Sequence, residues 1–373
     1  MQIKTLNKIA ACGLERFGAA YTVGDDVAEP NGILVRSASL HEAELPESLL
    51  AIARAGAGVN NIPLDRCSEA GVVVFNTPGA NANAVKELIL AGMLISSRKV
   101  IDAIEWAKTL KGQGAEVTKL VEKGKAQFAG PEIKGKKLGV IGLGAIGGLV
   151  ANAAHSLGME VYGFDPFLSV DASREQIFAE CDYITVHTPL TPETKDMFCA
   201  ASFATMKDGV RILNFARAEL VNAADMKEAL ASGKVAAYVV DFPTDEVLGV
   251  PGVIAIPHLG ASTPESEDNC AVMAVDELKA YLEDGVIRNS VNFPSVDVPR
   301  STDHRLCVLH RNIPNMLTGI SGAVSAEGIN IETMTNRSKK DYAYTILDVV
   351  GDPSDESLDK IRAIDGVIRL RKI

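Results

Sequence analysis

The chain has 373 residues, of which 37 are Lys or Arg and 48 are Asp or Glu, so its formal net charge at pH 7 is −11. This length predicts two or three domains of roughly 150 residues each. The acidic balance argues against a nucleic-acid binder, which usually carries a basic patch. No run reaches the ~18 consecutive apolar residues of a membrane helix, and the first residues lack the apolar block of a secretory signal.

The six cysteines stand far apart in the sequence, and no two have the short spacing of a zinc site. Their even number is compatible with three disulfides, but most lie in apolar or helical runs. We therefore expect buried, reduced thiols in a cytoplasmic protein, and no metal.

The first 90 residues alternate short apolar runs with helical patterns. Residues 33–35 and 72–75 are typical of buried parallel strands, and 76–79 form a turn. A helical pattern covers 84–108. The following stretch, 110–137, is polar and rich in glycine and lysine, and it leads into a new unit.

That unit alternates strands and helices strictly, which predicts a doubly wound parallel sheet. Asn222 is a suitable N-cap for the helix 223–231. The predicted strands are 138–141, 160–164, 183–187, 210–215, 235–240 and 253–256.

The rest of the chain begins with a long helical pattern over 264–283 that has Pro264 at its first position. Residues 289–303 have two prolines and no helical period, which is typical of a linker. A strand–helix–strand–strand–helix–strand order follows, a ferredoxin-like βαββαβ plan. Its predicted elements are 305–310, 315–327, 330–336, 343–350, 355–363 and 367–372.

Gly142, Gly144 and Gly147 form a G-x-G-x-x-G motif between a buried strand and an apolar helix, as dinucleotide binding requires. The first glycine allows the tight turn, the second allows a pyrophosphate to approach, and the third allows helix and strand to pack closely. Asp165 follows the end of the next strand, 18 residues after Gly147. Its carboxylate can bind ribose hydroxyls and would repel a 2′-phosphate, which favours NAD over NADP. Alternatively, Asp165 only caps a turn with Pro166.

Three polar residues stand just past buried strands of this sheet, namely Arg217, Asp241 and His258. A single arginine at such a position is usually the partner of an acidic residue in a salt bridge. A single histidine there usually has a structural role. Together at successive strand ends, an arginine can clamp a carboxylate and a histidine can move a proton. We therefore expect hydride transfer at an alcohol carbon beside a carboxylate. His187 is interpreted as structural, with Thr188 and Pro189 lining the cofactor.

Motifs over nearly the whole chain resemble the D-isomer-specific 2-hydroxyacid dehydrogenase family, in a form with a C-terminal ACT domain. They lie at 55–61, 76–81, 142–147, 214–217, 241–244 and 257–260. The resemblance implies an α/β fold in which a Rossmann-type doubly wound parallel sheet (93–261) is inserted in a flavodoxin-like substrate domain (1–92 and 262–300). A ferredoxin-like ACT domain (304–373) would follow.

The resemblance also implies residue roles. Arg217 would hold the substrate carboxylate and C2 oxygen, and His258 would be the acid/base, oriented by a loop carboxylate. Counting from Asp241 favours Glu246, which we choose, whereas matching Phe-Pro-Thr favours Asp245. Asp241 would meet the nicotinamide amide. The expected cofactor-binding set is Gly142, Gly144, Ala145, Ile146, Gly147, Asp165, Thr188, Pro189, Ala216, Asp241 and Gly260.

For the substrate, Arg36 and Ser37 resemble the family's phosphate-facing pair, and Gly56 and Gly58 would expose backbone N–H groups to the carboxylate. Lys86 replaces a small residue and is a possible second cation; a solvated helix lysine is equally plausible. Ala218 replaces a usual glycine. The implied reaction is NAD-dependent oxidation of 3-phospho-D-glycerate to 3-phosphohydroxypyruvate, the first step of serine biosynthesis. The alternatives are another small 2-hydroxy acid, or a non-catalytic NAD(H)-sensing protein.

In the C-terminal segment, His310, Asn312 and Asn330 match positions that hold serine in feedback-inhibited relatives. Asn315 replaces a glycine, and asparagine tolerates left-handed backbone better than most residues. We therefore expect L-serine as an effector and a homo-dimer or homo-tetramer. The alternative is a purely structural dimerisation module.

Overall fold

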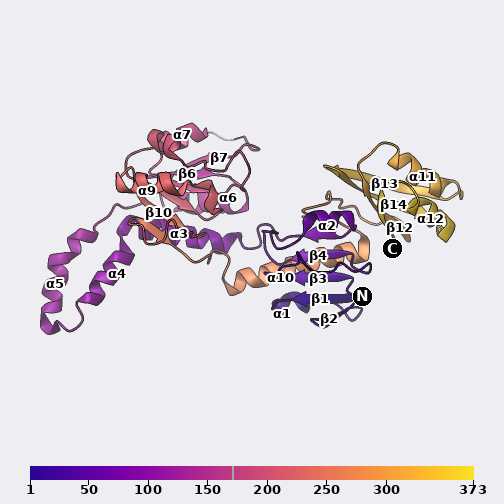
Figure 1. Ribbon diagram of the computed structural model, residues 1–373, viewed down its shortest axis with the longest axis horizontal. Helices are drawn as coiled ribbons and strands as arrows, with labels where there is room; N and C mark the ends of the chain where they lie inside the picture. Colours follow the sequence, from indigo (N-terminus) through magenta and orange to yellow (C-terminus); the bar gives the residue numbers. More distant parts are fainter. Residues whose placement is uncertain (170–171) are drawn as a thin grey trace. The chain divides into compact units, whose positions relative to one another are not determined.

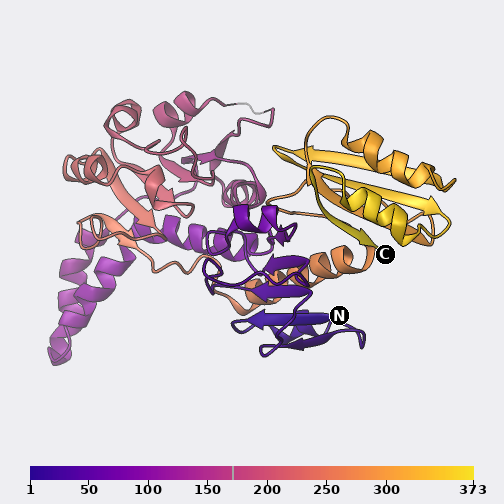
Figure 2. The ribbon, with the colours of Figure 1, turned by 45° about the vertical axis from the view of Figure 1, so that its right-hand side comes forward.

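The computed structural model describes residues 1–169 and 172–373, which form two compact units (Figures 1 and 2). Unit 1 comprises Met1–Asn81 and Pro264–Ile373, and unit 2 comprises Ala82–Thr263. The division differs from the expected one in two places. The boundary expected at residue 92 falls inside helix α3 (Ala82–Arg98), which belongs entirely to unit 2, and the segment 304–373 is part of unit 1.

The N-terminal sheet of unit 1 has five parallel strands in the order β2-β1-β3-β4-β5. This 2-1-3-4-5 order is flavodoxin-like, as expected, and reverses direction between β1 and β3. Helix α10 (Pro264–Asp284) packs on the sheet, with Ala274 and Leu278 in one core with Leu34 and Ala53. The remaining elements are β1 (Gln2–Leu6), α1 (Ala11–Leu14), β2 (Thr22–Gly24), β3 (Gly32–Val35), β4 (Ala51–Arg54), α2 (Leu64–Glu69) and β5 (Val73–Phe75).

The C-terminal part of unit 1 has the predicted βαββαβ order and an antiparallel sheet, β13-β14-β12-β15. Side chains of β12 alternate between its two faces. Leu306 and Val308 pack with the helices, whereas Cys307 and Leu309 join the core of the N-terminal sheet. Its elements are β12 (His304–Arg311), α11 (Met316–Ser325), β13 (Asn330–Lys339), β14 (Tyr342–Val350), α12 (Asp355–Arg362) and β15 (Val367–Lys372).

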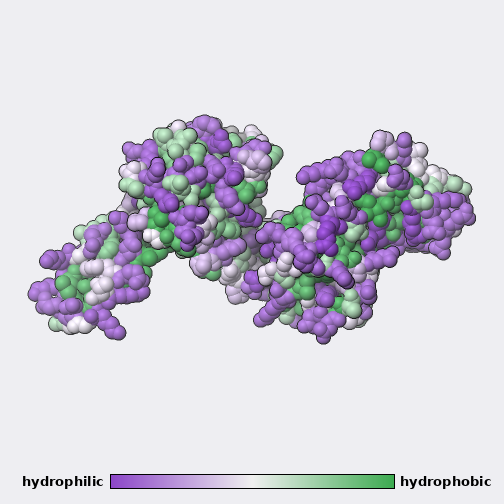
Figure 3. All heavy atoms as spheres, in the orientation of Figure 1, coloured by the Kyte–Doolittle hydropathy of each residue, from purple (hydrophilic) through white to green (hydrophobic). Residues whose placement is uncertain are grey.

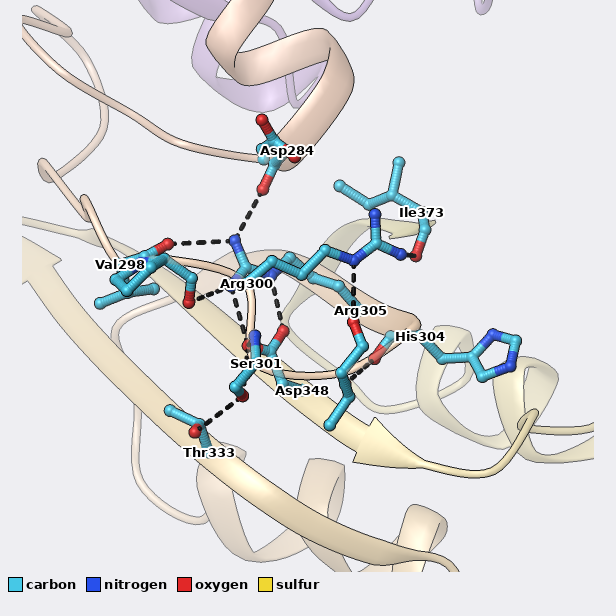
Figure 4. A network of polar contacts seen from close by, with 12 residues as sticks. Asp284, Val298, Arg300, Ser301, His304, Arg305, Thr333, Asp348 and Ile373 are labelled. Carbon is cyan, nitrogen blue, oxygen red and sulfur yellow. Dashed lines mark hydrogen bonds and ion pairs between the residues drawn. The ribbon is translucent and has the colours of Figure 1, made fainter.

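A buried ion pair joins two strands of this C-terminal sheet, and its two residues also hydrogen-bond to the chain that precedes the sheet (Figure 4). Arg305 and Asp348 are both fully buried, and Arg305 Nε and Nη2 donate to the two carboxylate oxygens at 2.6 and 2.8 Å. The guanidinium also donates to the carbonyls of Asp284 and Pro299, each at 2.9 Å. Ser301 donates its backbone N–H to Asp348. The C-terminal end of the segment expected to be a linker, at Pro299 and Ser301, is therefore held by hydrogen bonds to Arg305 and Asp348.

Unit 2 is the predicted doubly wound parallel sheet, with strand order β11-β10-β9-β8-β6-β7. The order reverses between β6 and β8, which is where such sheets bind ligands. Apolar cores cover both faces, with Ile184 on one and Tyr183 on the other. The elements are β6 (Lys137–Ile141), α6 (Ala145–Ser156), β7 (Glu160–Phe164), α7 (Arg174–Glu180), β8 (Tyr183–Val186), α8 (Ala200–Thr205), β9 (Val210–Asn214), α9 (Ala223–Ala231), β10 (Val235–Val240) and β11 (Val253–Ala255).

Residues 84–128 differ most from the sequence prediction. The single helix expected over 84–108 is two helices, α3 and α4 (Val100–Thr109), separated at Lys99, whose φ is +47°. The polar stretch contains helix α5 (Val117–Gly124) and two 3₁₀ turns, which lie beside α4 and project from the sheet of unit 2 (Figure 1). The aromatic pair Trp106 and Phe128, with ring centroids 5.3 Å apart, explains why this polar stretch folds back onto α4.

The α4–α5 arm has no buried side chain, and apolar residues lie among the hydrophilic ones on its surface (Figure 3). Val100, Ile101 and Ile104 are among the exposed large apolar residues. Across residues 1–169 and 172–373, no helix combines the length and the hydropathy that crossing a membrane requires.

Candidate active site

The glycine motif forms an open cradle at the N-terminus of α6. Gly142 has a φ of +93°, and a Cβ there would lie 2.9 Å from the carbonyl of His187. A Cβ on Gly147 would lie only 1.9 Å from the carbonyl oxygen of Gly142, so strand and helix pack too closely for any side chain. A Cβ on Gly144, the N-cap residue, would meet nothing within 4 Å. The open space faces the free backbone N–H groups at Ala145 and Ile146, a suitable place for a pyrophosphate.

Thr188 and His187 border this cradle. The Thr188 Oγ1 atom is buried and has no hydrogen-bond partner among the described residues, so it is available to a ligand. His187 Nε2 contacts Thr185 Oγ1 at 3.0 Å, and burial lowers the pKa of His187 to about 3. His187 is therefore neutral near pH 7 and packs beside the turn, in keeping with a structural role. Pro189 follows on the exposed side.

Asp165 caps the turn that follows β7, which is the alternative role considered from the sequence. Its Oδ2 accepts the backbone N–H of Leu143 and its Oδ1 that of Phe167, each at 2.9 Å. The carboxylate thus ties the glycine turn to the end of β7 and also caps the turn after it. Each oxygen keeps a second lone pair for a ribose hydroxyl. These groups fit a dinucleotide with a free ribose 2′-OH.

A buried amide fixes the backbone of Arg217 just past β9. Asn214 is fully buried, and its Nδ2 donates to the Arg217 carbonyl at 2.8 Å and to the Tyr238 hydroxyl at 3.2 Å. Its Oδ1 accepts the N–H of Ala216 at 3.1 Å. Burial raises the pKa of Tyr238 to about 12, so the hydroxyl remains protonated. Sequence reasoning missed Tyr238, although a tyrosine inside the apolar run 235–240 was a visible signal.

Asp241 holds the turn that carries His258. It is almost fully buried at the end of β10, and its two oxygens accept the backbone N–H groups of Leu259 and Gly260 at 2.8 and 2.9 Å. Burial raises the pKa of Asp241, and the two N–H groups counter part of that rise. His258 itself has a φ of +52°, a left-handed conformation that non-glycine residues rarely adopt.

The aromatic ring of Phe242 connects the two candidate catalytic side chains. Its centroid lies 4.4 Å from that of the His258 imidazole, and the Arg217 guanidinium carbon lies 5.4 Å from it. Both Arg217 and His258 are exposed to solvent. The ends of β9, β10 and β11 therefore bring a guanidinium and an imidazole to one ring.

The loop carboxylates do not pair with this histidine. Asp245 and Glu246 are both exposed, and the Thr244 hydroxyl lowers the pKa of Glu246 below its usual value. Among the residues described here, neither carboxylate forms a hydrogen bond or ion pair with the His258 ring. The geometry therefore does not choose between Glu246 and Asp245.

The residues expected to bind substrate in unit 1 follow β3 and β4. Arg36 forms an ion pair with Glu267 at 2.8 Å, and the Ser37 backbone N–H donates to Asn7 Oδ1 at 2.9 Å. Gly56 has a φ of +150°, and a Cβ there would lie 2.3 Å from the Arg54 guanidinium. Arg54 is a cation that sequence reasoning missed, although it stands at a strand end directly before the glycine-rich segment that includes Gly58.

Lys86 lies in the second turn of α3, in unit 2. Its Nζ donates to Asn83 Oδ1 at 2.6 Å and lies 3.9 Å from the Glu87 carboxylate. The neighbouring Val85 packs against Gly260, where a Cβ would meet it at 3.4 Å. Lys86 is therefore near the His258 turn in unit 2, but its ammonium is engaged on its own helix.

The expected effector residues differ in exposure. Asn312 and Asn330 are exposed, and Asn312 Nδ2 donates to the Lys340 carbonyl at 3.0 Å. His310 is buried, with its ring nitrogens 2.9 Å from Thr345 Oγ1 and 2.7 Å from the Arg311 carbonyl, and burial lowers its pKa. Asn315 has a φ of +70°, so asparagine does adopt the left-handed position there.

All six cysteines are free thiols, four of them buried. Within the part of the chain that the structure describes, no group of three or more His, Cys, Asp or Glu side chains could hold a metal ion.

Sequence comparison identifies residues 90–260 with a family model described as D-isomer specific 2-hydroxyacid dehydrogenase, NAD binding domain. The D-3-phosphoglycerate dehydrogenase of Haemophilus influenzae is 30% identical over 374 residues, covering 93% of this chain and 88% of that protein. The enzyme of the same name from Escherichia coli K12 is 31% identical, covering 87% and 82%. That of Archaeoglobus fulgidus is 34% identical, but the chain spans only 53% of its length.

Solved structures agree in fold. The NAD+-bound 3-phosphoglycerate dehydrogenase of Entamoeba histolytica has a TM-score of 0.61 and 26% identity, covering 78% of this chain and 98% of that one. The TT0316 protein of Thermus thermophilus has a TM-score of 0.64 and 26% identity, covering 78% and 100%.

Proposed function

This chain belongs to the D-isomer-specific 2-hydroxyacid dehydrogenase family, and we propose that it oxidises 3-phospho-D-glycerate to 3-phosphohydroxypyruvate, with NAD as cofactor. The observation that carries the proposal is the placement of Arg217 and His258 on one ring, Phe242, beside a dinucleotide cradle in the same unit. A guanidinium for a carboxylate and an imidazole for a proton are the two groups that oxidation of a 2-hydroxy acid needs.

Bound NAD supplies the hydride acceptor. The Arg217 guanidinium binds the substrate carboxylate and the C2 oxygen, and its fork of N–H donors suits both. His258 takes the proton of the C2 hydroxyl as the alcohol becomes a ketone, and it returns that proton in the reverse direction. Asp241 holds the turn on which His258 stands.

Recognition of the substrate phosphate is assigned to Arg36 and Ser37, with backbone N–H groups near Gly56 and Gly58 for the carboxylate. The ion pair of Arg36 with Glu267 is exposed, and such pairs contribute only ~0–1 kcal/mol, so a phosphate dianion can replace the glutamate. Lys86 would add a second cation if it leaves Asn83.

The test is NADH formation from 3-phospho-D-glycerate, glycerate, D-lactate and other small 2-hydroxy acids at matched concentrations. The proposal predicts the highest kcat/KM for the phosphorylated substrate. Preference for an unphosphorylated acid would favour a different dehydrogenase of the same family. NADH binding without turnover of any acid would favour an NAD(H)-sensing protein.

We also propose that the C-terminal βαββαβ segment is an ACT domain that binds L-serine and lowers activity. The exposed side chains of Asn312 and Asn330 would bind the ammonium and hydroxyl groups of serine. The buried His310, which is hydrogen-bonded to Thr345, would instead stabilise the loop that carries Asn312. Calorimetry with L-serine and the intact protein tests this, and Asn312→Ala should abolish inhibition while uninhibited turnover stays intact. An absence of binding at millimolar serine would leave the segment structural.

The proposed assembly is a homo-dimer or homo-tetramer in the cytoplasm. The exposed apolar side chains Val100, Ile101 and Ile104 on the α4–α5 arm support self-association. Light scattering with Ile101→Lys should show a smaller particle than the unchanged chain.

A further inference from the structure

We propose that Phe242 is a positioning residue that places Arg217 and His258 together for the reaction. This inference rests on the proposed function, because it gives Arg217 and His258 the roles described above. Phe242 follows Asp241 directly at the end of β10, and its side chain is partly exposed. It is not itself a donor or acceptor, so any contribution must pass through its neighbours.

The contact with His258 fixes the imidazole where the backbone alone does not. Asp241 holds the N–H groups of Leu259 and Gly260, which determines the path of the turn. The same turn leaves the His258 side chain exposed, and the ring of Phe242, 4.4 Å away and tilted by 44°, packs against the imidazole. Asp241 thus positions the backbone of His258, and Phe242 positions its ring.

The contact with Arg217 serves the same purpose for the guanidinium. Asn214 anchors the Arg217 carbonyl, and Arg217 Nη1 donates to the carbonyl of the adjacent Ala216 at 2.6 Å. The exposed side chain otherwise extends into solvent. An arginine over an aromatic face is attracted by the ring and held to one plane, which leaves its outward N–H groups free for a carboxylate.

The geometry matters because Arg217 and His258 act on substituents of the same carbon. Arg217 binds the carboxylate and C2 oxygen while His258 removes the proton from that oxygen, so an error in their relative position affects every turnover. A displacement of ~1 Å at such a site can cost about 10²-fold in rate.

The experiment compares Phe242→Leu with Phe242→Tyr, which keeps the ring. We expect Phe242→Leu to lower kcat for 3-phospho-D-glycerate about 10- to 100-fold and to raise KM, while the Kd for NADH stays within about 2-fold. The kcat and KM of Phe242→Tyr should stay within about 3-fold of the values for the unchanged enzyme. Phe178→Leu, which removes a ring of the same unit that contacts Phe198, is the matched control and should leave kcat and KM unchanged.

Double variants show whether the ring acts through its neighbours. In a His258→Ala or an Arg217→Ala background, one of the two contacts of the ring remains, so Phe242→Leu should lower kcat and raise KM by smaller factors than in the otherwise unchanged enzyme. The positioning role would be overturned if Phe242→Leu changed kcat and KM by equal factors in all backgrounds. It would also be overturned if Phe242→Leu alone changed kcat by less than about 2-fold. If Phe242→Leu does not fold, Phe242→Met supplies the same comparison. Near-normal turnover of His258→Ala is a separate result, because it refutes the proposed reaction mechanism itself.

Discussion

The carboxylate of Asp241 accepts the backbone N–H of Gly260 at 2.9 Å, and a Cβ at position 260 would lie 2.8 Å from that same oxygen. The glycine of the Pro-His-Leu-Gly sequence is thus required by the aspartate of the Asp-Phe-Pro-Thr sequence. These two motifs, separated in the chain by residues 245–256, form one structural unit around His258.

Asp241→Asn tests this unit directly. The amide replaces one acceptor oxygen with a donor that faces a backbone N–H, so one buried hydrogen bond is lost. The free energy of unfolding should fall by about 1–3 kcal/mol, with a larger relative loss of kcat than of NADH affinity. Urea unfolding and steady-state kinetics measure both. Asp208→Asn, at an exposed pair with Lys234, is the control and should change stability by less than about 0.5 kcal/mol.

Thr188→Val should separate cofactor binding from stability. The buried hydroxyl has no protein partner among the described residues, so an isosteric methyl costs the folded chain nothing and can stabilise it. We expect an unchanged or higher melting temperature together with a Kd for NADH raised about 5- to 10-fold, equivalent to the loss of one hydrogen bond. A lower melting temperature with unchanged NADH affinity would mean that the hydroxyl serves the fold.

Asp165 should determine the cofactor preference. We expect a strong preference for NAD over NADP, and Asp165→Ala should narrow it, because the carboxylate no longer repels a 2′-phosphate. The variant should also lose stability, since Leu143 and Phe167 lose their acceptor. The ratio of kcat/KM for the two cofactors is the measurement. Equal efficiency of the unchanged enzyme with NAD and NADP would contradict the assignment.

The carboxylate partner of His258 can be identified by pH dependence. His258→Ala should lower kcat by ~10²–10⁴, the usual contribution of a general acid/base. Glu246→Gln and Asp245→Asn are then compared in the pH profile of kcat/KM. Only the variant at the true partner should shift the acidic limb. Unchanged profiles for both would mean that His258 acts without a carboxylate partner.

The buried pair of Arg305 and Asp348 should make stability depend on pH. Burial opposes ionisation of Asp348, but its hydrogen bonds with Arg305 and Ser301 hold the pKa of the carboxyl below its usual value. Because the folded pKa is depressed, the pair stabilises the protein above the unfolded pKa of about 4, and this stabilisation is lost as pH falls through the folded pKa. Asp348→Asn should lower the free energy of unfolding by about 3–5 kcal/mol near pH 7.

The comparison for that variant is Asp352→Asn, which removes an exposed partner of Lys372. Its effect should stay below about 1 kcal/mol. Similar losses from Asp348→Asn and Asp352→Asn would contradict a special role for the buried pair.

Much of the fold could be predicted from hydrophobic pattern. Strands such as Val73–Phe75 are fully buried runs of β-branched and aromatic residues, and the glycine motif fixes where the cofactor sheet begins. Strand Ala51–Arg54 was missed because two alanines and an arginine have little β-propensity. Helix Val117–Gly124 was missed because its sequence is polar. The stretch that contains it is held to α4 by a tertiary interaction, the contact between the rings of Trp106 and Phe128.

In the candidate site, the positions of the main residues could be predicted from the sequence, but their side-chain contacts could not. Strand ends locate Arg217, Asp241 and His258, because parallel strands place their carboxyl ends along one edge. The side-chain contacts were beyond sequence reasoning. That Phe242 touches both Arg217 and His258 depends on the left-handed turn at His258, and the burial of His310 depends on Thr345 across the sheet.

The division of unit 1 between two sequence segments has a consequence for folding during synthesis. Leu34 and Ala53 share a core with Leu278 and Tyr344. The first 81 residues can therefore complete their fold only after residues from the last 110 have been synthesised, whereas unit 2 is continuous and can fold as it leaves the ribosome. At ~5–20 residues per second, the ribosome needs roughly 15–60 s to pass from residue 81 to 373. Until residue 284 at the end of α10 has been synthesised, the apolar strands β3, β4 and β5 lack their covering helix, and aggregation or chaperone binding competes with completion of the fold.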